Sequence, residues 1–159
     1  MTKSKTIGAT FIISGVVLLV FSAFAFFVVP KIFAPPQKVF IGSGSFEARL
    51  ALNEESREKG LSGVSKLDSD QVLLMVFDSE DRWSIWMKDM KIPIDVVWLD
   101  SNKKVIYIVK NISPITSTDK VFLPKDPAKY VIEFPAGSVD EYSINLNSLA
   151  IFQLDEETD

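Results

Sequence analysis

The feature that most limits how this chain can fold is a long apolar segment without charges, residues 7–29. These 23 positions read IGATFIISGVVLLVFSAFAFFVV and contain no acidic or basic side chain. A helix that rises 1.5 Å per residue would make the segment about 34 Å long, against a hydrocarbon core of about 30 Å. We therefore expect a transmembrane helix here, in contact with the lipid bilayer, and a separately folded domain after it.

The orientation of this segment rests on the layout of the chain, because the flanking charges are nearly balanced. Lys3 and Lys5 precede the segment, and Lys31 and Lys38 follow it, so the distribution of positive charge gives little information. A short tail, one span and a long domain are typical of a signal anchor. We expect a single-pass cell-membrane protein with its N-terminus in the cytoplasm and its domain outside. The alternative is secretion after signal-peptide cleavage at the AFA sequence of residues 23–25.

The sequence divides into four parts on this interpretation. Residues 1–29 form the tail and anchor, and residues 30–37 form a linker that three prolines stiffen. Residues 38–153 form one folded domain. Residues 154–159 form an acidic tail.

The chain contains neither histidine nor cysteine. Disulfides, thiolate nucleophiles, histidine general bases and the common zinc sites are therefore excluded. Any acid–base chemistry would need Asp, Glu, Lys or Tyr, and we expect neither a cofactor nor a metal. The net charge of −4 and the scattered basic residues argue against nucleic acid as a partner, since phosphate binding needs a clustered basic face.

Short apolar stretches alternate with turn residues throughout the domain, which is typical of β-strands. The pattern predicts Phe46, Ala48, Leu50 and Leu52 on the inner face of one strand. Residues 71–77 are apolar on both faces, as in a central strand. The expected strands cover residues 38–42, 45–52, 71–77, 94–100, 104–112, 129–135 and 149–154.

Turn and capping residues complete the predicted fold. Gly42-Ser43-Gly44 and Ser101-Asn102 are predicted to connect neighbouring strands as turns. Asn53 is predicted to begin a short helix that Gly60 ends, and Ser138–Glu141 reads as a capping box that begins a second helix. We therefore expect an α+β fold: a compact, β-rich, barrel-like domain of seven or eight strands with two short helices.

Four blocks of the sequence resemble the family called domain of unknown function 192, DUF192. They are SREKGLSGVSKL, LLMVF, IWMKDMKIPIDVVWLD and AKYVIEFPAG, in this order and spacing. The resemblance covers about residues 38–153 and implies a compact, β-rich, barrel-like fold, often after a signal peptide or anchor. It implies no established activity, substrate or cofactor. The sequence departs from the family pattern at 60–64, at 88–90 and at 147–148.

Asp95 interrupts an apolar stretch that otherwise reads as a buried strand. Alternation places Ile94 and Trp98 on one face and Asp95 on the other. Burying an unpaired carboxylate costs several kcal/mol, so a partner is expected. Arg57 and Lys88 are the candidates, and Arg57 suits the role better because its planar guanidinium can meet a carboxylate with two hydrogen bonds.

Three interpretations of this region remain open. Asp95 forms a structural ion pair, or it acts as a catalytic carboxylate, or a wall of a ligand pocket consists of Trp86, Met87, Lys88, Asp89 and Asp95. The third is the binding-site hypothesis, with Arg57 included as the expected partner of Asp95. No residue is assigned a catalytic role. We also expect Trp98 to lie in the core and Trp86 to have an exposed edge.

The sequence therefore favours a membrane-anchored, envelope-exposed module that binds a polar ligand, a cell-wall component or an envelope protein. The alternative is an enzyme acting on an envelope glycan or a similar polar substrate. In that enzyme Asp95 or Asp89 would be the acid or base and Lys88 would give electrostatic support. A third possibility is a structural domain that positions other proteins beside the membrane.

Overall fold

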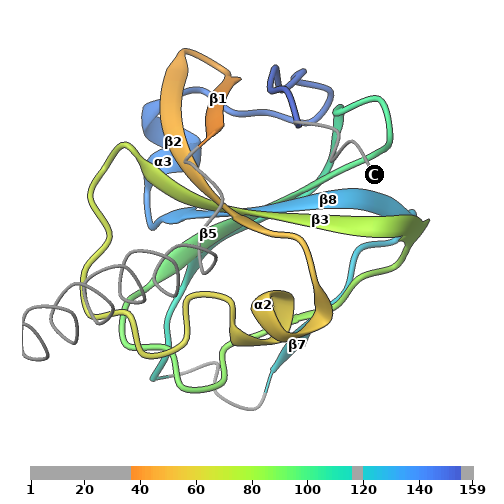
Figure 1. The fold of residues 1–159 in the computed structure, drawn as a ribbon. Coiled ribbons are helices and arrows are strands. Elements are labelled where there is room, and N and C mark those ends of the chain that lie inside the picture. The colour runs from red at the N-terminus through yellow and green to blue at the C-terminus, as the bar shows by residue number, and fades with distance from the viewer. Residues whose placement is uncertain (1–36, 116–119, 155–159) are drawn as a thin grey trace, which may run out of the picture. The chain divides into compact units, whose positions relative to one another are not determined.

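A six-stranded sheet forms the centre of the domain (Figure 1). The computed structural model describes residues 37–115 and 120–154. In chain order, the elements are β1 (Gln37–Ile41), β2 (Gly44–Ala51), α2 (Glu54–Lys59), β3 (Gln71–Asp81), β4 (Ile85–Trp86), β5 (Ile94–Leu99), β6 (Val105–Ile112), β7 (Val121–Phe122), β8 (Ala128–Pro135) and α3 (Ser138–Glu141).

The strand order of the sheet is β1-β2-β3-β8-β5-β6, and β4 and β7 form a separate pair. β2 and β3 run parallel, with α2 between them in the chain, and the other neighbouring strands run antiparallel. The predicted central position of residues 71–77 is confirmed, because β3 lies between β2 and β8. Its buried side chains follow one another without alternation, as expected for a strand covered on both faces.

Two hydrophobic clusters lie on opposite faces of the central strands. In β5, Val97 and Leu99 belong to one cluster, and Val96 and Trp98 belong to the other. This is the alternation that the sequence predicts. β1 and α3 cover the first face, and α2, β4 and β7 cover the second (Figure 1). We call these the α3 face and the α2 face.

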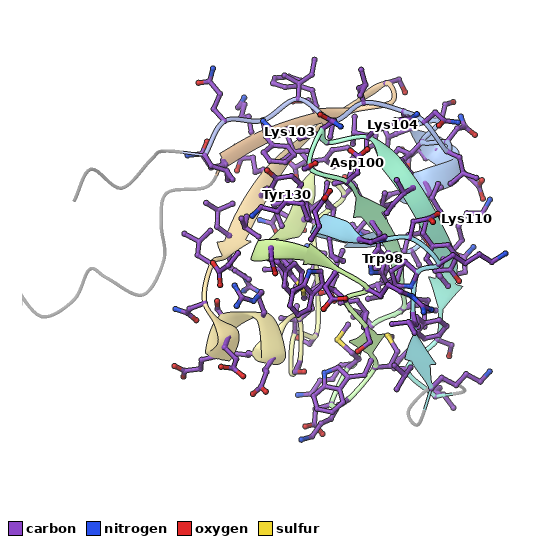
Figure 2. All side chains as sticks on the ribbon, turned by 90° about the vertical axis from the view of Figure 1, so that its right-hand side faces the viewer. Trp98, Asp100, Lys103, Lys104, Lys110 and Tyr130 are labelled. Atoms are coloured by element: carbon purple, nitrogen blue, oxygen red, sulfur yellow. The ribbon has the colours of Figure 1, made fainter. Side chains whose placement is uncertain are left out.

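Several local predictions are confirmed. β1 and β2 pair across Gly42–Gly44, and β5 and β6 pair across the turn that contains Ser101 and Asn102. Figure 2 shows Asp100, Lys103 and Lys104 gathered at this second turn. The Asp100 carboxylate accepts hydrogen bonds there from the backbone N–H groups of Asn102 and Lys104, at 2.9 and 2.8 Å. A short side chain that bonds the backbone ahead of it is typical of such turns.

The expectation of a barrel is wrong for the described residues, because the sheet is open. Its edges, β1 and β6, do not pair with each other. The segment 149–154, predicted as a strand, forms only isolated bridges from Leu149 to Lys104 and from Ile151 to Phe40. It approaches both edges but does not continue the hydrogen-bond ladder, so the barrel does not close.

One further prediction, for Leu52, is wrong, and another, the membrane anchor, concerns residues that the structure does not describe. Leu52 is exposed, because β2 ends at Ala51 and the chain turns there into α2. The predicted anchor at 7–29 lies outside the described residues. Among residues 37–115 and 120–154, no helix has the length and apolar character of a membrane span.

Candidate functional site

A pocket of about 450 Å³ lies on the α2 face of the domain. Residues from α2, the loop after it, β3, β4, β7 and β8 line it. Among them are Arg57, Gly60, Phe77, Trp86, Val121 and Glu133. The volume lies within the usual range of small-molecule pockets, about 300–1,000 Å³.

The α2 wall of the pocket begins with a capping box that fixes the start of the helix. The Asn53 side chain accepts a hydrogen bond from the Ser56 N–H at 2.9 Å, and the Ser56 hydroxyl accepts one from the Asn53 N–H at 3.1 Å. Glu54 and Glu55 occupy the first turn, where the N-terminal end of the helix dipole favours negative charge. The predicted Asn53 cap is confirmed.

Arg57 fastens α2 to the sheet. Its Nη1 atom donates hydrogen bonds to the backbone carbonyls of Leu52 and Val76, both at 2.8 Å. Its guanidinium also lies over the ring of Phe77, 5.0 Å from the centroid. Arg57 therefore joins helix to sheet, as expected, but it does so through carbonyl groups and an aromatic ring. Within the part of the chain that the structure describes, its ion pair is with the exposed Asp78, at 3.9 Å.

Gly60 brings the end of α2 close to the sheet. Its backbone has φ +50° and ψ −132°, a combination that side chains other than glycine rarely adopt. A Cβ atom at this position would lie 3.6 Å from Oε2 of Glu133. The glycine therefore lets the helix end directly against the Glu133 carboxyl group.

Aromatic rings form another part of the pocket wall. The rings of Phe77 and Trp83 stack with centroids 4.2 Å apart and 10° between their planes. The buried indole of Trp98 donates a hydrogen bond from Nε1 to the Trp83 carbonyl at 2.8 Å, which holds this segment in place. Trp86 has 49% of its surface exposed, at the pocket. The predictions for Trp98 and Trp86 are both confirmed.

Glu133 is the one carboxylate of the pocket that lies inside the protein. It occupies the middle of β8, pairs with Leu73 of β3 and Val96 of β5, and is only 3% exposed. Its Oε2 atom is buried and has no hydrogen-bond partner within the described part of the chain. An unsatisfied buried polar group of this kind costs about 1–3 kcal/mol, and more when it is charged.

Burial dominates the protonation of Glu133. It raises the pKa of the carboxyl from 4.5 to about 7, against smaller downward effects of the Arg49 charge and a hydrogen bond from the Leu61 backbone N–H. Glu133 is therefore divided between its charged and neutral forms near neutral pH. It can accept a hydrogen bond, donate one or exchange a proton with a molecule in the pocket.

Asp95 has a different role from any that the sequence indicated. It is fully buried, and its carboxylate accepts three backbone N–H bonds: from Asn111 at 2.7 Å, Gly137 at 3.0 Å and Val139 at 2.9 Å. The expected ion pair with Arg57 or Lys88 is therefore wrong. These three donors satisfy the carboxylate without any cation.

This arrangement also corrects the predicted start of the second helix. α3 has Gly137 at its N-cap position, and its own side chains make no capping hydrogen bond, so Ser138–Glu141 is no capping box. Asp95 supplies the cap from β5. It lies on the α3 face, across the sheet from the pocket, so it is neither a wall of the pocket nor free for acid–base chemistry.

Some of the remaining predicted site residues line the pocket and others do not. Arg57 and Trp86 both line the pocket, so these two are brought together. Met87 is a core residue of the α2 face. Lys88 and Asp89 are exposed and do not line the pocket, although Lys88 places its ammonium 5.2 Å from the Trp86 ring centroid.

Two of the departures from the family pattern meet beside the pocket. The Ser62 hydroxyl donates a hydrogen bond to the Lys88 carbonyl at 2.8 Å, and the Gly63 N–H donates one to the Asp89 carbonyl at 2.9 Å. Asp89 has φ +56°, which Asp and Asn tolerate better than most residues. The segment around Lys88 is therefore held, through its backbone carbonyls, by hydrogen bonds from the loop after α2.

Sequence reasoning did not single out Glu133, although a signal for it was present. A carboxylate interrupts the apolar strand 129–135 just as Asp95 interrupts 94–100. Alternation alone would have placed Glu133 beside Val131 on the α2 face. Within the described residues, no group of three or more acidic side chains is close enough to hold a metal ion.

Comparison with protein families gives a match to DUF192, described as uncharacterized ACR, over residues 38–149. The chain belongs to the DUF192 family. Among its relatives, a UPF0127 protein of Thermococcus gammatolerans is 28% identical over 101 residues, which cover 64% of this chain and 63% of that protein. A UPF0127 protein of Pyrococcus furiosus is 32% identical over 77 residues, which cover 47% of this chain and 62% of that protein. This DUF192 chain therefore spans less than two thirds of the length of either relative.

Two crystal structures share the fold. A protein from Sinorhizobium meliloti, described as a putative transcription regulator, superimposes with a TM-score of 0.72 at 20% identity, covering 77% of this chain and 98% of that one. A protein of unknown function from Novosphingobium aromaticivorans gives 0.68 at 20% identity, covering 76% and 93%. At this identity the likeness concerns the fold alone.

Proposed function

We propose that this DUF192 protein is a membrane-anchored, envelope-exposed binding protein whose domain takes a small molecule into the α2-face pocket. The observation that carries the proposal is the buried Glu133 carboxyl group beside a pocket of about 450 Å³, since its Oε2 has no hydrogen-bond partner among residues 37–115 and 120–154. Such a group lowers the stability of the fold. A ligand that satisfies it would recover that free energy on binding.

The shape of the site favours a small ligand over a large protein partner. Its polar groups converge in a hollow between α2 and β8, rather than on a flat exposed surface, which is the usual form of small-molecule sites. The aromatic wall of Phe77, Trp83 and Trp86 supplies contact area. The anchoring part of the proposal rests on the uncharged segment 7–29.

Nucleic acid is a less suitable partner for this surface. The pocket is lined by the acidic Glu54, Glu58 and Glu133 and by the basic Arg57 and Lys59. A surface that binds phosphates needs an excess of positive charge in one region. The description of the Sinorhizobium protein as a putative transcription regulator therefore finds no support in the charges of this pocket.

The proposal can be tested by thermal unfolding of the full chain in mild detergent with four probes. The probes are tryptamine, tryptophol, indole-3-propionate and N-acetylglucosamine. Val121 and Leu149 are 63% and 62% exposed, and of the two only Val121 lines the pocket, so Val121→Trp and Leu149→Trp form a matched pair. At least one probe should raise the Tm of the wild type and of Leu149→Trp, but not of Val121→Trp. Equal shifts in both variants, or none in the wild type, would contradict the proposal.

A second candidate function is an acid–base enzyme in which Glu133, rather than Asp95 or Asp89, moves the proton. The observation that favours it is the Glu133 pKa of about 7, since a general base is most effective when its pKa is near the working pH. Incubation with oligomers of N-acetylglucosamine, followed by mass spectrometry, tests this candidate. Product formation that Glu133→Gln abolishes would support an enzyme acting on an envelope glycan.

A further inference from the structure

The charged side chains of the pocket differ in how far they are already engaged. Arg57 directs Nη1 to two backbone carbonyls and lies over an aromatic ring. Glu133 has one oxygen without any hydrogen bond inside the described residues. Glu54, Glu58 and Lys59 also line the pocket, but they are exposed to solvent. Of the two charged groups that are at least partly buried, Arg57 is committed to holding α2, whereas Glu133 still has a free bonding position. Away from solvent, a ligand therefore meets an available acceptor rather than an available donor.

The remainder of the wall favours an apolar body on the ligand. Met75, Phe77, Ile85, Trp86 and Met90 line the pocket. Aromatic rings and thioether side chains make favourable contacts with flat or flexible apolar groups. A hydrophilic ligand such as a free sugar would leave most of its hydroxyl groups unpaired against these side chains.

We propose, building on the binding function above, that the ligand is an amine. A protonated amino group on an apolar or aromatic body would pair with the free Oε2 of Glu133. No covalent bond changes in this step. Ammonium N–H groups donate to the carboxylate, and the body packs against the aromatic wall.

The proton balance of this complex gives it a distinctive pH dependence. The Glu133 pKa of about 7 means that binding an ammonium group requires the neutral fraction of Glu133 to release its proton to solvent. Affinity should therefore rise about tenfold between about pH 6 and pH 8.

The other charged groups around Glu133 should not contribute to that change. Arg49 faces the carboxyl from β2, and α2 brings Glu54, Arg57, Glu58 and Lys59 to the same pocket. Carboxylates, lysines and arginines ordinarily keep their charge across this pH range. The chain has no histidine that could titrate there.

Calorimetric titration of the full chain in detergent, with a matched set of probes, tests the assignment. Tryptamine, tryptophol and indole-3-propionate share one ring and end in an ammonium, a hydroxyl and a carboxylate respectively, while n-hexylamine offers an aliphatic body. At pH 8, tryptamine should bind at least tenfold more tightly than its two ring analogues. At pH 6, tryptamine itself should bind about tenfold more weakly than it does at pH 8. n-Hexylamine should show the same pH dependence.

Glu133→Gln provides the decisive variant, because an amide keeps the shape of the side chain and an oxygen for the Leu61 N–H. It should remove both the preference for tryptamine and the pH dependence. Leu149→Trp should bind as the wild type does. If tryptophol or indole-3-propionate binds as tightly as tryptamine, and Val121→Trp prevents this binding, the amine assignment is wrong but the pocket still binds ligands. If neither amine binds at millimolar concentration, or if Glu133→Gln leaves amine binding unchanged, the assignment is overturned.

Discussion

Asp95 and Glu133 occupy adjacent strands, where Asp95 pairs with Phe134 and Val96 pairs with Glu133. Both are buried carboxylates in apolar strands, yet they point to opposite faces of the sheet. Three backbone donors surround Asp95, whereas Oε2 of Glu133 has no partner among the described residues. At the scale of the residue, the number of donors therefore distinguishes a structural carboxylate from one available to a ligand.

Replacing Asp95 by alanine should destabilise the domain by about 3–5 kcal/mol, because it leaves three backbone N–H groups, one buried and two partly buried, without their carboxylate acceptor. Urea unfolding of the full chain in detergent measures this loss. Asp100→Ala is the matched control, since that carboxylate accepts two backbone bonds in a surface turn and should cost about 1 kcal/mol. Equal stability of Asp95→Ala and the wild type would show that α3 does not need this cap.

Replacing Glu133 by glutamine should change how stability depends on pH. The unfolded carboxyl has a pKa of 4.5 and the folded one about 7, so the folded state holds the proton more tightly. The stability associated with the neutral carboxyl is fully present below about pH 4.5 and is lost as pH rises through 7. The total loss should be about 3 kcal/mol, from about 1.36 kcal/mol per unit of pKa difference.

Urea unfolding of both proteins at about pH 4.5 and about pH 8 measures this effect. Glu133→Gln should be close to wild type at the lower pH and more stable by about 2–3 kcal/mol at the higher one. Asp95→Asn is the control, because it also replaces a buried carboxylate by an amide, but on the α3 face of the sheet. A constant difference between Glu133→Gln and wild type across this range would mean that Glu133 titrates in the same way when folded and unfolded.

At the scale of the element, the end of α2 brings the helix against the sheet. Gly60 and Gly63 both have positive φ, +50° and +78°, but a Cβ would meet Met75 and Glu133 only at Gly60. Either substitution by alanine should cost about 1–2 kcal/mol through backbone strain. Only Gly60→Ala should also raise the pH at which this stability is lost. The added methyl group further desolvates the Glu133 carboxyl and so raises its pKa in the folded state.

Thermal unfolding as a function of pH distinguishes the two glycine variants. Gly63→Ala should follow the wild-type pH profile at a lower Tm, since nothing lies within 4 Å of its added Cβ. If both variants keep the wild-type profile, α2 does not approach the carboxyl as closely as the structure indicates.

Most of the large elements could be predicted from the sequence, for physical reasons that are local. Alternation identified β1, β2 and β5, and the Asn53 and Gly60 caps identified α2. β4 and β7 have only two residues each, too few to show a period. The segment 149–154 alternates like a strand but forms only bridges, since hydrogen bonding to a sheet edge depends on distant parts of the chain.

The site was less predictable than the fold, because the groups that contact one another in it come from distant parts of the sequence. Of the residues in the binding-site hypothesis, Arg57 and Trp86 line the pocket, but the predicted pairing of Arg57 with Asp95 is wrong. The donors to Asp95 are backbone groups of Asn111, Gly137 and Val139, and a backbone N–H carries no side-chain signal. Glu133 carried the same sequence signal as Asp95, but only the packing of α2 and Gly60 against it makes it part of a pocket.

At the scale of the whole molecule, we expect residues 7–29 to hold the protein in the membrane. An uncharged helix of this length should resist extraction, so alkaline carbonate should leave the full-length chain in the membrane pellet. Protease added outside should digest the domain. A mature N-terminus near Phe26 would instead show cleavage after the AFA sequence and contradict the anchor.

The binding role of the pocket depends on how Glu133 titrates with and without a ligand. The full chain in detergent micelles can be labelled with ¹³C at the glutamate side-chain carboxyls and titrated by NMR, with Glu133→Gln to assign the signal. The Glu133 carboxyl should titrate near 7 when the pocket is free, as its burial requires, and its pKa should fall when tryptamine is added. A Glu133 signal that titrates near the ordinary value of 4.5, unchanged by tryptamine, would contradict both the buried carboxyl and its role as the counter-ion of an amine.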